Sequence, residues 1–238
     1  MIADLTEYLT GIAIGIRYRI NFSVEDQLGR ILDQILYSKD SFFNPGVFPR
    51  ALTTNVNEKR LINENTGDQL IINNSNIILE IGFGDSFEPS DMSDIIEAFH
   101  GQLVDGIMKT YRITEINRVG LIHRYLYKKE DLAKTFIDKT IGGTLEGIND
   151  INLTFSKKIP EQEALVQKDV NDYYNVIFNV IKKADRQELF MSIDYQKYFD
   201  PFLQSSSTLE FPQFVEKAIA FNKGNYQSWL TKNYGVLQ

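Results

Sequence analysis

Residues 14–22 read IGIRYRINF, and residues 119–127 read VGLIHRYLY. In one ungapped register Gly15 matches Gly120, 105 positions further along the chain. The same register aligns Arg19 with Arg124, Glu25 with Glu130, Asp26 with Asp131, and Asp33 with Asp138. An apolar segment follows each copy. The echo indicates two related strand–helix units, and either duplication or similar local structure without common descent would produce it.

Residues 12–22 have the alternation that is typical of a strand. β-Branched and aromatic residues recur at every second position, which places Arg17 and Arg19 together on the opposite face. Ser23 then has the chemistry of a helix cap, and acidic residues follow it in the first turn. We therefore expect a helix that runs to about Tyr37.

The next part of the chain favours an antiparallel meander. Residues 60–63, 69–72 and 77–83 are strand-like, and turns rich in Asn and Gly separate them. The segment 38–50 contains two prolines and a glycine and reads as a loop. Apolar residues at helical spacing predict a long helix from about residue 90 to Tyr111. The remaining expected elements are a strand over 116–127, a helix over 129–141, a strand over 151–159, a hairpin over 173–182 and 189–198, and a closing helix from Pro212.

These elements define the expected fold class. Strands that come in runs, with helices between the runs, favour an α+β fold in which antiparallel meander sheets pack against amphipathic helices. The clearest break is Gly142-Gly143, so we place the boundary between two packed lobes there, with residues 1–142 in one and 143–238 in the other. A length of 238 residues fits one or two domains.

The composition excludes or disfavours several classes of protein. The net charge is −7 and the basic residues are scattered, which disfavours nucleic acid as the main partner. The chain has no cysteine, which excludes disulfides, cysteine-ligated metals and thiol nucleophiles. It has no apolar leader, and its longest apolar stretch, residues 8–16, is too short to span a bilayer. We expect a cytoplasmic protein without membrane contact.

The strongest candidate binding site is a set of arginines. Arg17 and Arg19 share a face of the first strand, and Arg118 and Arg124 share a face of the second. If the strands are neighbours, two to four guanidinium groups converge and suit a phosphate or a carboxylate. The alternative is an open sheet face on which the arginines pair with acidic side chains, namely Glu80, Glu115 or Asp194.

Histidine is scarce, and its positions do not predict a metal site. His100 and His123 are the only two, and neither has a second histidine at metal-ligand spacing. Alternation puts His123 on the strand face opposite Arg124, where a buried structural histidine is favoured over a functional one. We keep His123 as a candidate ligand-binding residue, and expect no metal and no cofactor.

The enzymatic alternative is a metal-dependent phosphoesterase or nuclease. Asp194 stands near Lys197 on an expected strand, a faint likeness to the core of restriction-type nucleases. Asp85 and Asp185 would supply further acids, and Arg19 and Arg124 would bind the phosphate. The sequence has no nucleophilic-serine elbow, kinase set or phosphate-loop lysine, so it favours a protein that is not an enzyme.

Three stretches occur in a characteristic order. RLINEN at residues 60–65 leads to LII at 70–72, VGLIHRY occupies 119–125, and FMSIDY at 190–195 precedes the closing helix. Together they resemble a sporadically distributed bacterial family of uncharacterised proteins of about this length. His123 interrupts the place where that family has Arg-Tyr directly after Gly-Leu. The family's patchy occurrence implies mobile or defence-associated genes.

The resulting expectation is a non-enzymatic interaction or regulatory subunit of a bacterial accessory system, such as antiphage defence, in a larger complex with another protein. Tyr226, Trp229 and Tyr234 are the candidate partner-binding residues, although they also suit packing onto their own lobe. The alternatives are the phosphoesterase and a small-molecule sensor, for example of a nucleotide, with a pocket between the lobes.

Overall fold

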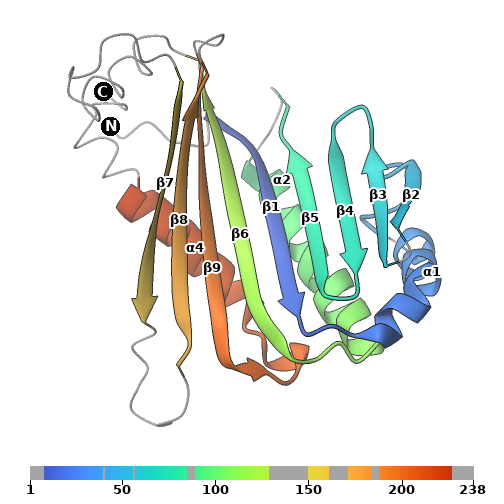
Figure 1. Ribbon diagram of the computed structural model, residues 1–238. Coiled ribbons are helices and arrows are strands. Elements are labelled where there is room, and N and C mark those ends of the chain that lie inside the picture. The colour runs from blue at the N-terminus through green and yellow to red at the C-terminus, as the bar shows by residue number, and fades with distance from the viewer. Residues whose placement is uncertain are drawn as a thin grey trace, which may run out of the picture.

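One antiparallel sheet forms the framework of the molecule (Figure 1). The computed structural model describes residues 8–39, 41–55, 57–84, 89–128, 150–160, 171–183 and 188–226. Nine strands follow one another across the sheet in the order β2-β3-β4-β5-β1-β6-β9-β8-β7. Their bounds are β1 Leu9–Tyr18, β2 Arg50–Asn55, β3 Glu58–Asn63, β4 Asp68–Asn73, β5 Asn76–Gly82, β6 Ile116–Tyr127, β7 Ile151–Pro160, β8 Tyr173–Lys182 and β9 Leu189–Leu203.

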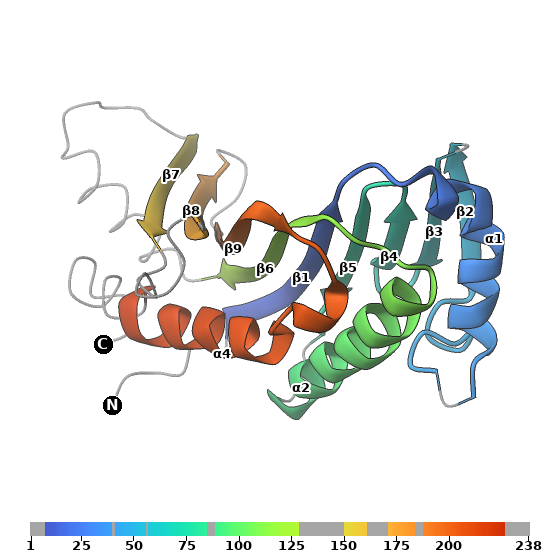
Figure 2. The same ribbon diagram turned by 90° about the horizontal axis from the view of Figure 1, so that it is seen from below.

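The helices are amphipathic and cover one face of this sheet. They are α1 Phe22–Tyr37, α2 Pro89–Ala98 with its π-helical continuation η2 Phe99–Met108, the 3₁₀ turn η3 Ser206–Thr208, and α4 Phe211–Phe221 with the π-helical η4 Asn222–Tyr226. Figure 2 shows α2 and α4 on one side of the sheet. None of the helices in the described part of the chain has the length and apolar character needed to cross a membrane.

Alternation along the strands decides which side chains reach the helices. In β1, Ile12, Ile14 and Ile16 are buried beneath the helices, whereas Gly15 and Arg17 face the other side. The helices contribute their own buried stripes, such as Leu28 and Ile31 of α1 and Leu103 and Ile107 of η2. These residues join one hydrophobic core that extends from β3 to β8. The opposite face of the sheet has no described helix over it.

Most of the elements match the expectations from sequence. The meander is present as β3, β4 and β5, the second strand as β6, and the hairpin as β8 and β9. Pro212 lies in the first turn of α4, where its missing N–H costs nothing. The expected helix over 129–141 lies outside the described residues. The fold class is α+β.

Two local expectations need correction. The helix cap is Asn21 and not Ser23, because Asn21 is extended and its Oδ1 accepts from the Ser23 N–H at 3.0 Å. β1 accordingly ends at Tyr18, four residues earlier than expected. A strand that is not expected from the sequence, β2, begins at Arg50, the last residue of the expected loop, and pairs with β3 from Arg50↔Ile62 onward.

The two halves of the chain supply adjacent blocks of the sheet. Residues 1–142 contribute β1 to β6, and residues 143–238 contribute β7 to β9. The blocks meet where β6 pairs with β9, from Ile116↔Leu203 to Tyr127↔Leu189. The sheet is therefore continuous across the expected boundary, and the division into two lobes stays a prediction.

Candidate functional site

The face of the sheet that has no described helix over it carries side chains in cross-strand rows. Strand pairing fixes three neighbouring rows over β5, β1, β6 and β9. The first is Asn76, Arg17, Arg118 and Tyr198, the second is Ile78, Gly15, Gly120 and Gln196, and the third is Glu80, Ala13, Ile122 and Asp194. We call this face the open face. The two central residues of the second row, Gly15 and Gly120, have no side chains. Their place is taken by a hollow of about 150 Å³ at the middle of the face.

The paired glycines Gly15 and Gly120 form the floor of this hollow. Neither has a positive backbone φ. A Cβ at Gly15 would lie 3.5 Å from Ile78 Cγ1, and one at Gly120 would lie 3.6 Å from Asp194 Oδ1, which are ordinary contacts. Neither backbone geometry nor packing therefore requires glycine, although glycine inside a strand costs roughly 0.5–1 kcal/mol. Such glycines often mark close approach by a ligand or another backbone.

Gly11, four residues earlier on β1, shows the contrasting case. A Cβ there would lie 2.6 Å from the carbonyl oxygen of Ile81, a backbone atom that cannot move aside on its own. Packing against β5 explains Gly11 completely. It does not explain Gly15.

Two arginines stand directly opposite each other at one end of the hollow. Arg17 of β1 pairs in register with Arg118 of β6. The Arg118 guanidinium donates to the Tyr198 hydroxyl at 3.2 Å and lies 5.7 Å from the centre of that ring. Arg17 is exposed and has no hydrogen-bond or ion-pair partner among the described residues. Like charges directly opposite destabilise a sheet, and an anion between them removes that cost.

Asp194 and Gln196 form the polar wall on the β9 side. Gln196 Nε2 donates to Asp194 Oδ2, and Gln196 Oε1 accepts from the Tyr198 hydroxyl at 2.9 Å. Burial raises the pKa of the Asp194 carboxyl, while this hydrogen bond and the charge of Arg118 act in the opposite direction. Asp194 Oδ1 receives no hydrogen bond from the described residues and lies beside the floor of the hollow.

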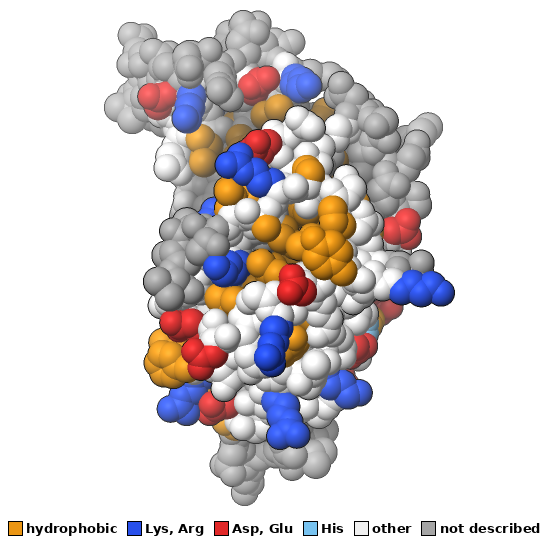
Figure 3. Space-filling view, turned by 90° about the vertical axis from the view of Figure 1, so that its right-hand side faces the viewer, with side chains coloured by type: hydrophobic (Ala, Val, Ile, Leu, Met, Phe, Trp, Pro, Cys, Tyr) orange, Lys and Arg blue, Asp and Glu red, His pale blue; other side chains and the backbone are white. Residues whose placement is uncertain are grey.

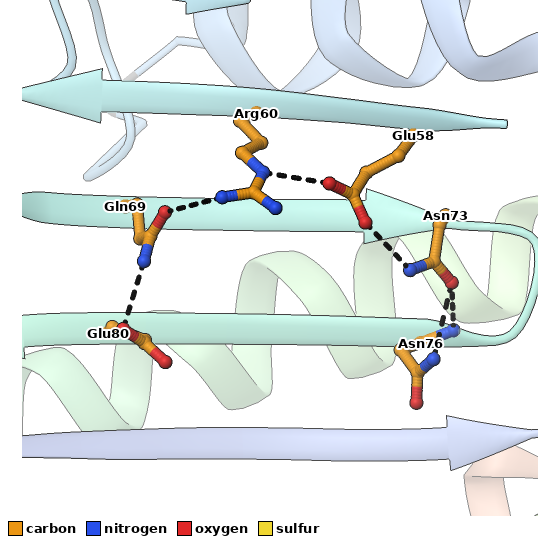
Figure 4. A network of polar contacts seen from close by, with 6 residues as sticks. All are labelled: Glu58, Arg60, Gln69, Asn73, Asn76 and Glu80. Atoms are coloured by element: carbon orange, nitrogen blue, oxygen red, sulfur yellow. Dashed lines mark hydrogen bonds and ion pairs between the residues drawn. The ribbon is translucent and has the colours of Figure 1, made fainter. Parts of the chain in front are cut away.

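A polar network extends over β3, β4 and β5 on the same open face and pairs the charged side chains there. Figure 4 shows it running from Asn76 on β5 to Asn73 on β4, then through Glu58 and Arg60 of β3 and back to Gln69 and Glu80. Arg124 of β6 joins it through a 3.3 Å ion pair with Glu80. Arg60 and Arg124 are thus paired with acidic side chains of the network. Arg17 and Arg118 are the arginines at the hollow that are suited to bind an anion.

The arginines expected from sequence are only partly brought together. β1 and β6 are neighbours, but Arg19 lies at one end of the pair, with Glu115 at 3.0 Å, and Arg124 lies at the other. Arg124 is opposite Gly11, eight residues from Arg19, which is roughly 27 Å along a strand. The alternative interpretation, in which arginines of an open face pair with Glu80 and Glu115, describes Arg124 and Arg19.

His123 lies on the opposite face of β6, among the core residues. It is 3% exposed, and its register partners are Ile12 of β1 and Ile193 of β9. Burial lowers its pKa to about 4, and its Nδ1 has no hydrogen-bond partner in the described part of the chain. His123 therefore takes no part in the arrangement around Arg17.

The residues of the nuclease alternative do not meet at one point. Asp194 faces the open side, whereas Lys197 lies under the helices between Tyr174 and Phe199 and pairs with Asp172 at 3.9 Å. Asp85 and Asp185 lie outside the described residues. Within the described ranges, no group of three or more His, Asp or Glu side chains could hold a metal ion.

The candidate partner-binding residues at the end of the chain remain predictions. Tyr226 ends η4, and its side chain is not described. Trp229 and Tyr234 lie outside the described residues.

Figure 3, which looks onto the side of β2 and α1, shows basic and acidic side chains interspersed with hydrophobic ones on that side.

The sequence pointed to the strands of this site but not to its main features. The echo contains Gly15 and Gly120 as a matched pair. Two glycines on neighbouring strands leave a hollow where they are opposite each other. Arg118 was recognised beside Arg124, but pairing register was needed to place it opposite Arg17. Comparisons with protein-family models, with curated proteins and with solved structures find no match for this chain.

Proposed function

We propose that this protein is a non-enzymatic binding protein that takes up a small anionic ligand in the hollow of its open face. The observation that carries the proposal is the pair of opposed arginines, Arg17 and Arg118, beside a floor made of two glycines that the fold itself does not require. Guanidinium groups bind phosphate and carboxylate through paired N–H donors. The glycine floor gives the rest of the ligand room to reach the backbone.

The groups around the hollow suit binding and orientation. Arg118 is held by Tyr198, and Asp194 is held by Gln196, so both are positioned before a ligand arrives. Apolar surface from Ile78 and Ile122 lies in the same hollow. Apolar surface together with a few oriented polar groups is the usual composition of a small-molecule site.

The expected role as a regulatory subunit follows from this proposal. A ligand that bridges β1, β5, β6 and β9 would stabilise the joint between residues 1–142 and 143–238, and binding of another protein would then depend on the ligand. A cytoplasmic location and a place in a bacterial defence system stay predictions of the same proposal.

Thermal-shift measurements with phosphate, sulfate and dicarboxylates test the proposal. A ligand that binds only the folded state raises the melting temperature, because it stabilises by RT ln(1 + [L]/Kd). We expect a rise for the wild type that Arg17→Gln and Arg118→Gln each abolish. Arg19→Gln is the matched control, since Arg19 is also exposed but pairs with Glu115 away from the hollow.

The opposite result is equally clear. If no anion shifts the melting temperature of the wild type, or if Arg19→Gln abolishes the shift as fully as Arg17→Gln does, the hollow is not the anion site.

A further inference from the structure

The hollow has a flat floor with two different walls, and this restricts what can occupy it. The floor is the paired backbone of Gly15 and Gly120, two strands wide, or about 5 Å from strand to strand. On the β5 side, Ile78 Cγ1 lies 3.5 Å from the place of a Gly15 Cβ. On the β9 side, Asp194 Oδ1 lies 3.6 Å from the place of a Gly120 Cβ. A planar ring fits such a floor, with an apolar contact at one edge and a polar contact at the other.

On the β9 side of the hollow, a ligand needs a hydrogen-bond donor. Asp194 Oδ2 already accepts from Gln196, whereas Oδ1 accepts no hydrogen bond from the described residues. Gln196 Oε1 accepts from the Tyr198 hydroxyl. The free acceptor therefore is Oδ1, and the ring edge that meets it must carry N–H groups, as nucleobases with amino or imino groups do.

An anion held between Arg17 and Arg118 would lie at a fixed distance from a ring on this floor. Arg17 and Arg118 stand one row away from the glycines, which is two residues along each strand or roughly 6–7 Å. The sugar of a nucleoside phosphate spans a comparable distance between its base and its phosphate. Guanidinium pairs are well suited to a phosphate, which accepts two N–H groups at once.

We propose that the ligand is a nucleoside phosphate, with its base on the Gly15–Gly120 floor, a base N–H donated to Asp194, and its phosphate between Arg17 and Arg118. This inference rests on the proposed function and adds the class of ligand and its orientation. The backbone of the floor contacts one face of the base and Ile78 contacts one edge, so affinity comes from the base as well as from the phosphate.

Isothermal titration calorimetry with AMP, GMP, CMP and UMP, compared with ribose 5-phosphate and inorganic phosphate, tests the assignment. We expect at least one nucleotide to bind at least tenfold more tightly than ribose 5-phosphate. Gly15→Val and Gly120→Ala both fill the floor, so each should remove this difference and leave phosphate binding unchanged. Circular dichroism spectra show whether the Gly15→Val protein folds, and Gly120→Ala provides the test if it does not.

Two further variants distinguish binding of the base from binding of the phosphate. Asp194→Asn removes the carboxylate acceptor and should lower the affinity for the nucleotide about tenfold relative to the affinity for phosphate. Arg17→Gln should lower the affinity for nucleotides and phosphate alike. Arg19→Gln should change neither.

The outcomes distinguish this inference from the proposed function. If ribose 5-phosphate or phosphate binds as tightly as every nucleotide, the base assignment is wrong, while the anion site stands. If only a single-stranded oligonucleotide binds, a free nucleotide is not the ligand and the assignment is also overturned. If no phosphate compound binds, the nucleotide assignment is wrong. The anion site fails as well if sulfate and dicarboxylates also leave the melting temperature of the wild type unchanged.

Discussion

His123 shows how a single buried side chain makes stability depend on pH. The imidazole lies in the core, its Nδ1 has no hydrogen-bond partner among the described residues, and burial lowers its pKa from 6.5 to about 4. The unfolded chain therefore binds a proton below pH 6.5 that the folded chain accepts only near pH 4. Stability from the neutral imidazole is complete above pH 6.5 and is lost as the pH falls toward 4.

We predict that replacing His123 by leucine removes this loss. Between pH 7 and pH 4 the wild type should lose about 3 kcal/mol through His123, at 1.36 kcal/mol per pKa unit. Urea denaturation at both pH values measures the difference between the two proteins. His100→Gln is the control for the loss of a histidine at a partly exposed position. Parallel pH profiles for wild type and His123→Leu would contradict the assignment.

The glycines of β1 give a second prediction at this scale. Gly11→Ala should destabilise the protein by about 1–3 kcal/mol or more, because its Cβ would collide with the Ile81 carbonyl and force the backbone to shift. Gly15→Ala should leave stability unchanged or raise it by about 0.4–1 kcal/mol, since it restricts the unfolded chain and meets only ordinary contacts. Chemical denaturation compares the two variants, and equal losses would show that Gly15 is also needed for packing.

At the scale of elements, α1 depends on how its first turn is closed. Asn21 accepts from the Ser23 N–H, and Asn74 in the β4–β5 turn donates to Glu25 at 3.1 Å. The helix start is thus held both by its own cap and by the sheet. Its buried stripe, which includes Leu28 and Ile31, then faces β3 and β4.

We expect Asn21→Ala to cost about 1 kcal/mol, because it leaves an N–H of the first turn without its partner. Asn21→Ser should retain most of the stability, since serine caps a helix almost as well as asparagine. Urea midpoints at constant m-value provide the measurement. A loss as large for serine as for alanine would mean that Asn21 acts through something other than the cap.

The strands show why some elements were predictable and others were not. β6 was found with correct bounds because its twelve residues alternate between the core and the open face. The sequence does not predict β2, because this short edge strand follows prolines and its residues Arg50–Asn55 show little alternation of apolar and polar side chains.

The candidate site depended on pairing that local pattern does not contain. In the echo, Gly15 matches Gly120 and Arg19 matches Arg124 in parallel order, but β1 and β6 are antiparallel. Antiparallel neighbours bring only one such matched pair face to face, and here it is the glycines. The arginines are consequently carried to opposite ends, and Arg17 and Arg118, which the echo does not match, become the opposed pair.

For the whole molecule, the central question is whether the two halves unfold together. β6 and β9 join them by a continuous ladder, and one hydrophobic core contains residues from both halves, among them Leu70 of β4 and Met191 of β9. A shared ladder and a shared core favour one cooperative transition. Lobes that are stable separately would instead give two.

Differential scanning calorimetry of the full chain with one core variant in each half decides between these cases. Leu70→Ala and Met191→Ala each remove a buried side chain and should cost about 2–5 kcal/mol. In a cooperative sheet, each variant lowers the same single transition by about 5–15 °C, since 1 kcal/mol corresponds to a few degrees for a chain of this size. If Leu70→Ala shifts one peak and Met191→Ala shifts another, residues 1–142 and 143–238 are independent lobes, and a ligand in the hollow at their joint would then control how they are held together.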